Sequence, residues 1–204
     1  LGREPHRPFE DVLPGIAPST ASVILIDESA SMHHHIQAAQ KTVLALTDCF
    51  ESLLCPTMVV GFRDGEDPDP MPTDRIIEQG RYHRVKGVNF DLFKTFEEPL
   101  HQILGRFAGI QTEGSTPMAD GIHLALNWLR ERREQQHLIF LLTDGMPTGL
   151  GDPKAVVRGL IARAQKEGCT LIAIGIGEGA KPVAHLFPDH VWAPDFESLP
   201  KLTI

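Results

Sequence analysis

The chain has 204 residues, of which 42% are hydrophobic and 23% charged, and its net charge is −8. This length suits one large α/β domain with a sizeable core. The acidic balance argues against nucleic acid or an anionic membrane as partner, and no apolar run reaches the roughly 18 residues of a membrane-spanning helix. Three cysteines without a close pair indicate no disulfide framework, which predicts a cytoplasmic location.

The first elements follow a proline-rich start. Residues 1–20 are predicted to be a lead-in segment, and residues 21–204 a single domain. The continuous apolar run SVILID (22–27) predicts a strand that is buried on both faces of a parallel sheet. An apolar stripe at three- and four-residue steps predicts a helix over 32–54, which Cys55-Pro56 ends.

A second strand is predicted at TMVVGF (57–62). Proline- and acid-rich sequence follows, so we expect an insertion loop around residues 63–90, with a small strand pair within 75–87. Apolar residues at helical spacing predict a second amphipathic helix over 91–107, kinked or broken at Pro99.

A helix start is signalled in the segment 114–136, where Thr116 is a candidate N-cap and Pro117 suits the first helical position. The remaining predicted elements are a strand at 137–144, a helix at 153–168, strands at 169–177 and 190–195, and the start of a final helix beyond them. Because strands and helices alternate, the sequence predicts a doubly wound, mostly parallel sheet.

Two of these strands end in an acid, Asp27 and Asp144. The carboxyl ends of neighbouring parallel strands meet at one edge of a sheet, where two carboxylates repel unless a cation or a proton intervenes. Ser29 and Ser31 follow the first acid, and Thr116 supplies a third hydroxyl from another loop. Such an all-oxygen set suits Mg²⁺, with Mn²⁺ or Ca²⁺ as alternatives, rather than zinc.

Three segments carry a family resemblance: DESASM at 27–32, the Thr-Pro of GSTPMADGI at 114–122, and LLTDG at 141–145. Together they resemble the metal-ion-dependent adhesion site (MIDAS) of von Willebrand factor A domains, and the likeness extends over roughly residues 20–200. The resemblance implies a Rossmann-like, six-stranded, mostly parallel sheet with one antiparallel edge strand and helices on both faces.

The resemblance also implies how the site is used. Ser29, Ser31 and Thr116 are expected to bind the cation directly, whereas Asp27 and Asp144 bind it directly or through water. A protein partner would present an acidic side chain that completes the coordination shell. On this basis the domain is a metal-dependent protein-binding module, and no enzymatic activity is expected of it by itself.

Two further segments indicate a branch of the family. GIGEG (175–179) with HVWAPDFESL (190–199), and the insertion after VVGFRD, are similar to the A domain of the T subunit of aerobic cobaltochelatase. That likeness implies a non-catalytic role beside an AAA+ ATPase. GIGEG lacks the full spacing of a phosphate-binding loop, so we interpret it as a glycine-rich strand exit.

Other interpretations stay open at this point. The segment 27–31 could be a plain capping turn, and a free-standing metal-dependent hydrolase or phosphatase is the catalytic alternative, although no G-x-S-x-G elbow is present. Candidates for the rim of the site are Glu28, His33, Ser115 and Gly145. Of these, Glu28 is expected to face outward, and the three adjacent histidines cannot share one helical face.

Overall fold

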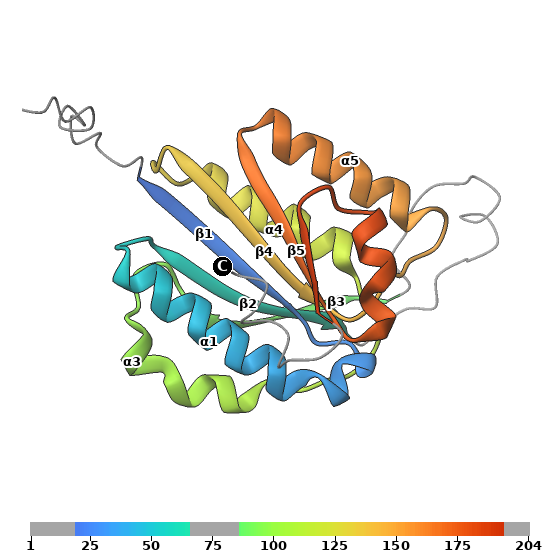
Figure 1. Ribbon diagram of the computed structural model, residues 1–204, viewed down its shortest axis with the longest axis horizontal. Helices are drawn as coiled ribbons and strands as arrows, with labels where there is room; N and C mark the ends of the chain where they lie inside the picture. The colour runs from blue at the N-terminus through green and yellow to red at the C-terminus, as the bar shows by residue number, and fades with distance from the viewer. Residues whose placement is uncertain (1–18, 66–85, 194–204) are drawn as a thin grey trace, which may run out of the picture.

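A mixed six-stranded sheet forms the centre of the computed structural model, which describes residues 19–65 and 86–193. Its strand order is β3-β2-β1-β4-β5-β6 (Figure 1). The strands are β1 (Thr20–Asp27), β2 (Thr57–Asp64), β3 (Val88–Lys94), β4 (Gln136–Thr143), β5 (Cys169–Ile176) and β6 (His190–Ala193). Only the β2–β3 pair is antiparallel among these neighbours. The predicted sheet, mostly parallel with one antiparallel edge strand, is therefore confirmed.

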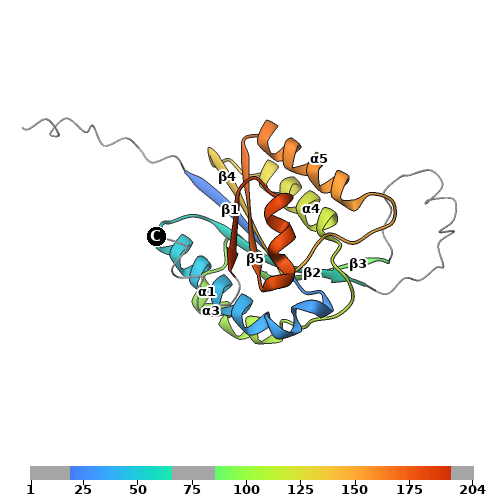
Figure 2. The ribbon, with the colours of Figure 1, turned by 45° about the vertical axis from the view of Figure 1, so that its right-hand side comes forward.

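Helices cover both faces of this sheet, with α1 and α3 on one side and α4 and α5 on the other (Figures 1 and 2). The α-helices are α1 (Ile36–Ser52), α3 (Leu100–Ile103), α4 (Met118–Arg130) and α5 (Pro153–Lys166). Three 3₁₀ segments are η1 (Ala30–His34), η2 (Leu104–Gly109) and η3 (Glu178–His185). None of the helices within the described ranges is long and apolar enough to cross a membrane.

Alternating residues of β1 divide between two cores. Val23 and Leu25 pack on the side of α4 and α5, whereas Ile24 and Ile26 pack on the side of α1 and α3. All four are fully buried, and each contributes about 1.5–3 kcal/mol of burial free energy. Because β1 lies between β2 and β4, its last residue is held at the carboxyl edge of the sheet beside the end of β4.

The helix predicted over 91–107 is wrong. The first part of that segment is the edge strand β3, and helix α3 begins only at Leu100, directly after Pro99. Residues 92 and 93 show why: Leu92 is 50% exposed and Phe93 is 5% exposed, as expected of neighbours on opposite faces of a strand. Pairing with β2 therefore overrides the helical spacing of the apolar residues.

Smaller differences affect the helix ends. The helix predicted from residue 32 is divided into η1 and α1, and α4 ends at Arg130 rather than 136. Pro117, not Thr116, is the residue before α4, and η3 was not predicted at all. The expectations for residues 1–18, most of 75–87 and everything beyond 193 lie outside the described residues.

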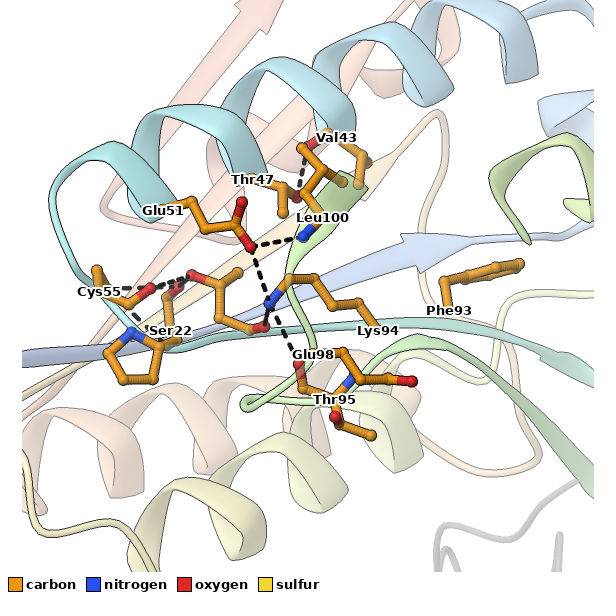
Figure 3. Close-up of polar contacts among 12 residues, drawn as sticks. Ser22, Val43, Thr47, Glu51, Cys55, Phe93, Lys94, Thr95, Glu98 and Leu100 are labelled. Carbon is orange, nitrogen blue, oxygen red and sulfur yellow. Dashed lines mark hydrogen bonds and ion pairs between the residues drawn. The ribbon is translucent and has the colours of Figure 1, made fainter. Parts of the chain in front are cut away.

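At the amino edge of the sheet, a buried lysine ties three elements together (Figure 3). Lys94 is 2% exposed, and its Nζ donates hydrogen bonds to the carbonyl oxygens of Thr57 (2.9 Å) and Thr95 (3.2 Å). Glu51 Oε1 lies 3.9 Å from the same Nζ and accepts a 2.6 Å hydrogen bond from Leu100 N. The end of α1, the start of β2 and the start of α3 are thus joined through polar contacts at this edge.

Candidate metal site

Three loops meet at the carboxyl edge of the sheet. The first loop (residues 28–31) follows β1, the second loop (113–117) precedes α4, and the third loop (144–148) follows β4. Each is short and begins or ends at a buried element, so the positions of the loop residues are set by the sheet and by α4.

Asp27, the last residue of β1, is fully buried. Its Oδ1 accepts a hydrogen bond from Ser29 N at 2.9 Å, and its Oδ2 accepts one from Thr143 Oγ1 at 2.6 Å. Burial raises the pKa of this carboxyl to about 6, although both hydrogen bonds oppose the rise. The ionised carboxylate is therefore costly to hold in the cation-free protein, and a bound cation would relieve that cost.

Hydroxyl groups connect this acid to the second one. Ser29 Oγ lies 3.1 Å from Ser31 Oγ, and Ser31 Oγ donates a 2.8 Å hydrogen bond to Asp144 Oδ1. Ser29 and Asp144 are nearly buried, whereas Ser31 is exposed. Ser29 precedes η1 without a side-chain capping bond, so the plain capping turn does not account for its hydroxyl. Four of the five predicted residues are consequently linked side by side.

Thr116, the fifth predicted residue, is 4% exposed in the second loop. This loop is fixed to both others through the backbone: Ala30 N donates to Gly114 O at 3.1 Å, and Thr148 N donates to Thr116 O at 2.9 Å. Thr116 is not the N-cap that the sequence suggested, because Pro117 occupies that position. The structure thus brings the Thr116 loop between the other two.

The rim candidates fall in different places. Ser115 Oγ donates a hydrogen bond to Asp64 Oδ2 and accepts one from Thr148 Oγ1 at 3.0 Å. Gly145 N donates to Thr143 Oγ1 at 3.2 Å, which brings the third loop back onto the end of β4. His33 is exposed, with its Nδ1 3.4 Å from the hydroxyl oxygen of a second-loop neighbour, Thr112.

The expectation that Glu28 faces outward is wrong. Its side chain is fully buried over Gly61 of β2, where an added Cβ would lie 2.3 Å from the Glu28 carboxyl carbon. Arg63 Nη1 is 2.9 Å from Glu28 Oε2 and also contacts Asp91. Burial and then the nearby Asp91 charge raise the pKa of Glu28 to about 8, while Arg63 opposes the rise. Because side chains alternate along the chain, Glu28 points to the opposite face from Asp27.

Sequence reasoning missed several residues that shape the site. Thr143 orients the Asp27 carboxylate, and the Thr before the acid in LLTDG was the available signal. The glycines of GIGEG allow close approach: a Cβ on Gly177 would lie 2.6 Å from His35 Nε2, and one on Gly179 would lie 3.0 Å from Asp144 O. Gly177 also has φ of 83°, which favours glycine.

The donor set fits a hard cation. Two carboxylates and the hydroxyls of Ser29, Ser31 and Thr116 are oxygen ligands, which Mg²⁺, Mn²⁺ and Ca²⁺ prefer. No group of three or more His, Cys, Asp or Glu side chains is placed to hold a metal ion within residues 19–65 and 86–193. The candidate site therefore depends on hydroxyl ligands, which complement only two acids.

Comparison with known proteins gives a family match. Residues 75–186 match the model of the von Willebrand factor type A domain, and no curated protein matches the chain. Similar solved structures include proximal thread matrix protein 1 from the mussel byssus, in a structure with a zinc-occupied MIDAS motif. It is 19% identical, with a TM-score of 0.62, over 90% of this chain and 43% of that one.

Two bacterial structures are similar to the same degree. The PilB minor pilin from Streptococcus sanguinis is 12% identical, with a TM-score of 0.65, over 90% of this chain and 59% of that one. The von Willebrand factor type A protein from Catenulispora acidiphila is 16% identical, with a TM-score of 0.62, over 90% of this chain and 41% of that one. At these identities the likeness establishes the fold, and this chain spans less than two thirds of each structure.

Proposed function

Because the chain belongs to the von Willebrand factor type A domain family, we propose that it is a protein-binding domain that acts through a bound divalent cation. The observation that carries this proposal is the linked set Asp27–Ser29–Ser31–Asp144, which joins the ends of two parallel strands. Thr116 lies in the loop that is bonded to both neighbouring loops.

In this proposal the five residues have distinct roles. Ser29, Ser31 and Thr116 bind the cation directly through neutral oxygens, and Asp27 and Asp144 bind it directly or through water. Neutral ligands leave the cation with positive charge, so it attracts a carboxylate. A partner protein supplies that carboxylate as an Asp or Glu side chain. Mg²⁺ is the expected cation, with Mn²⁺ and Ca²⁺ as alternatives.

We further propose that the domain works in the cytoplasm within an ATP-dependent complex of the metal-chelatase type, beside an AAA+ ATPase. The support is the resemblance of residues 175–179 and 190–199 to the cobaltochelatase T subunit. The domain would transmit motion without itself carrying out chemistry. Purification of the tagged protein from lysate with Mg²⁺ and ATP should recover an AAA+ ATPase, and its consistent absence would contradict this part.

Calorimetry tests the metal site. Titration of the purified chain with Mg²⁺, Mn²⁺, Ca²⁺ and Zn²⁺ should show binding that Asp27→Ala and Ser29→Ala abolish. Ser52→Ala, at an exposed serine at the end of α1, is the matched control and should bind as the wild type does. Unchanged affinity in the first two variants would overturn the proposal. Turnover of phosphate or ester substrates that depends on Asp27 would replace it with the hydrolase alternative.

A further inference from the structure

The residue between the first acid and the first serine of the site is buried in an ion pair that no metal ligand shares. We propose that Glu28 and Arg63 are positioning residues, whose buried contact fixes the first loop and thereby sets the spacing of the metal ligands. This inference rests on the proposed function. It adds two residues that would never touch the cation, and it assigns a role to Gly61, which makes room for them.

The backbone of Glu28 connects two neighbouring segments. Its N–H donates a 3.0 Å hydrogen bond to Phe62 O of β2, and its carbonyl accepts a 2.8 Å hydrogen bond from Glu113 N of the second loop. Asp27 and Ser29 are its covalent neighbours. A shift of Glu28 would therefore move ligands of the first loop and the anchor of the second loop together.

The side chain of Glu28 is held at one point. Its Oε2 lies 2.9 Å from Arg63 Nη1, and its Oε1 is buried without a hydrogen-bond partner. Arg63 is 14% exposed at its side chain and also contacts Asp91, which pairs with Gly61 across the β2–β3 ladder. The first loop is thus attached through Arg63 to both strands at this side of the sheet.

Ligand position matters for the expected cation. Mg²⁺ requires near-octahedral geometry, and groups behind the ligands of a metal site typically change its affinity 10- to 100-fold when they are removed. Glu28 stands in that relationship to Asp27 and Ser29. The contact is steric and hydrogen-bonded in this argument, so it should survive replacement of the acid by an amide of the same shape.

Four variants separate this role from the alternatives. Glu28→Ala and Arg63→Met should each weaken Mg²⁺ binding about tenfold, measured by calorimetry, whereas Glu28→Gln should stay within about threefold of the wild type. Lys94→Met removes another buried charge at the opposite edge of the sheet and should leave the affinity unchanged. Urea unfolding of all four reports the accompanying loss of stability.

Each contrary outcome has its own signature. If Glu28 acted through its charge, Glu28→Gln would bind as weakly as Glu28→Ala and Arg63→Met would bind more tightly. If the effect were a general loss of stability, Lys94→Met would weaken binding in proportion to its own destabilisation. Either result overturns the positioning role, as does normal binding by Glu28→Ala. Absence of cation binding by the wild type would overturn the proposed function itself, and this inference with it.

Discussion

Ser31 donates a hydrogen bond to Asp144, a residue 113 positions further along the chain, at 2.8 Å. The bond joins the loop after β1 to the loop after β4, two parallel neighbours whose carboxyl ends coincide. Because the metal site is assembled from separate loops, its properties should respond to charge and spacing in ways that the following experiments can measure.

Substitution of Asp27 by Asn should stabilise the cation-free protein at pH 7. The folded protein raises the pKa of Asp27 from 3.8 to about 6, so ionisation of this buried group costs up to about 3 kcal/mol. Urea unfolding in EDTA should show a gain for Asp27→Asn of about 1–3 kcal/mol at pH 7. Addition of Mg²⁺ should then stabilise the wild type but not the variant.

The same shift has a defined pH window. A raised folded-state pKa means that the folded protein holds the Asp27 proton more tightly than the unfolded chain does. Its contribution to stability is therefore fully present below pH 3.8 and is lost as the pH rises to about 6. In EDTA, the difference between wild type and Asp27→Asn should shrink as the pH falls through this window. A constant difference from pH 4 to 7 would contradict the assignment.

Cation binding should show the opposite dependence on pH. A carboxylate must lose its proton before it can bind a metal, so the affinity for Mg²⁺ should fall about tenfold per pH unit below pH 6. Calorimetry between pH 5 and pH 8 measures this slope. An affinity that stays level down to pH 5 would mean that Asp27 does not need to ionise in this window for the cation to bind.

Alanine at position 61 should destabilise the protein by about 1–3 kcal/mol, because its Cβ would lie 2.3 Å from the Glu28 carboxyl carbon. Gly159→Ala in α5 is the matched control, since nothing lies within 4 Å of its added Cβ. In a helix interior that change should instead stabilise by about 0.5–1 kcal/mol. Urea unfolding of the two variants decides the sign at each site, and equal effects would contradict the packing of Glu28 over Gly61.

Removal of the Lys94 ammonium should cost about 1–3 kcal/mol, because the Thr57 and Thr95 carbonyls lose their donor (Figure 3). Lys94→Met keeps the length of the side chain and tests this by urea unfolding. Lys154→Met, at an exposed position in α5, is the control and should change stability by less than about 0.5 kcal/mol. A neutral Lys94→Met would show that the buried amino group contributes no net stability.

The site could be predicted where strand ends alone determine it. An uninterrupted apolar run ending in an acid specifies both a buried parallel strand and the edge where its last side chain lies, as for Asp27. The orientation of Glu28 could not be predicted in this way, because the space it occupies exists only where Gly61 pairs beside it. The edge strand β3 was missed for a related reason: Leu92 and Phe93 acquire opposite environments only through pairing with β2.

The direction of the strands gives the domain two unlike poles for attachment to a surface. β1 starts at Thr20, at the pole away from the three loops, whereas β6 runs parallel to β5 and ends at Ala193 on the same side as those loops. A tether joined ahead of residue 19 would leave the three loops facing solution, and one joined just after residue 193 would crowd them. Immobilised in the first orientation, the domain should capture an acidic partner more readily than in the second.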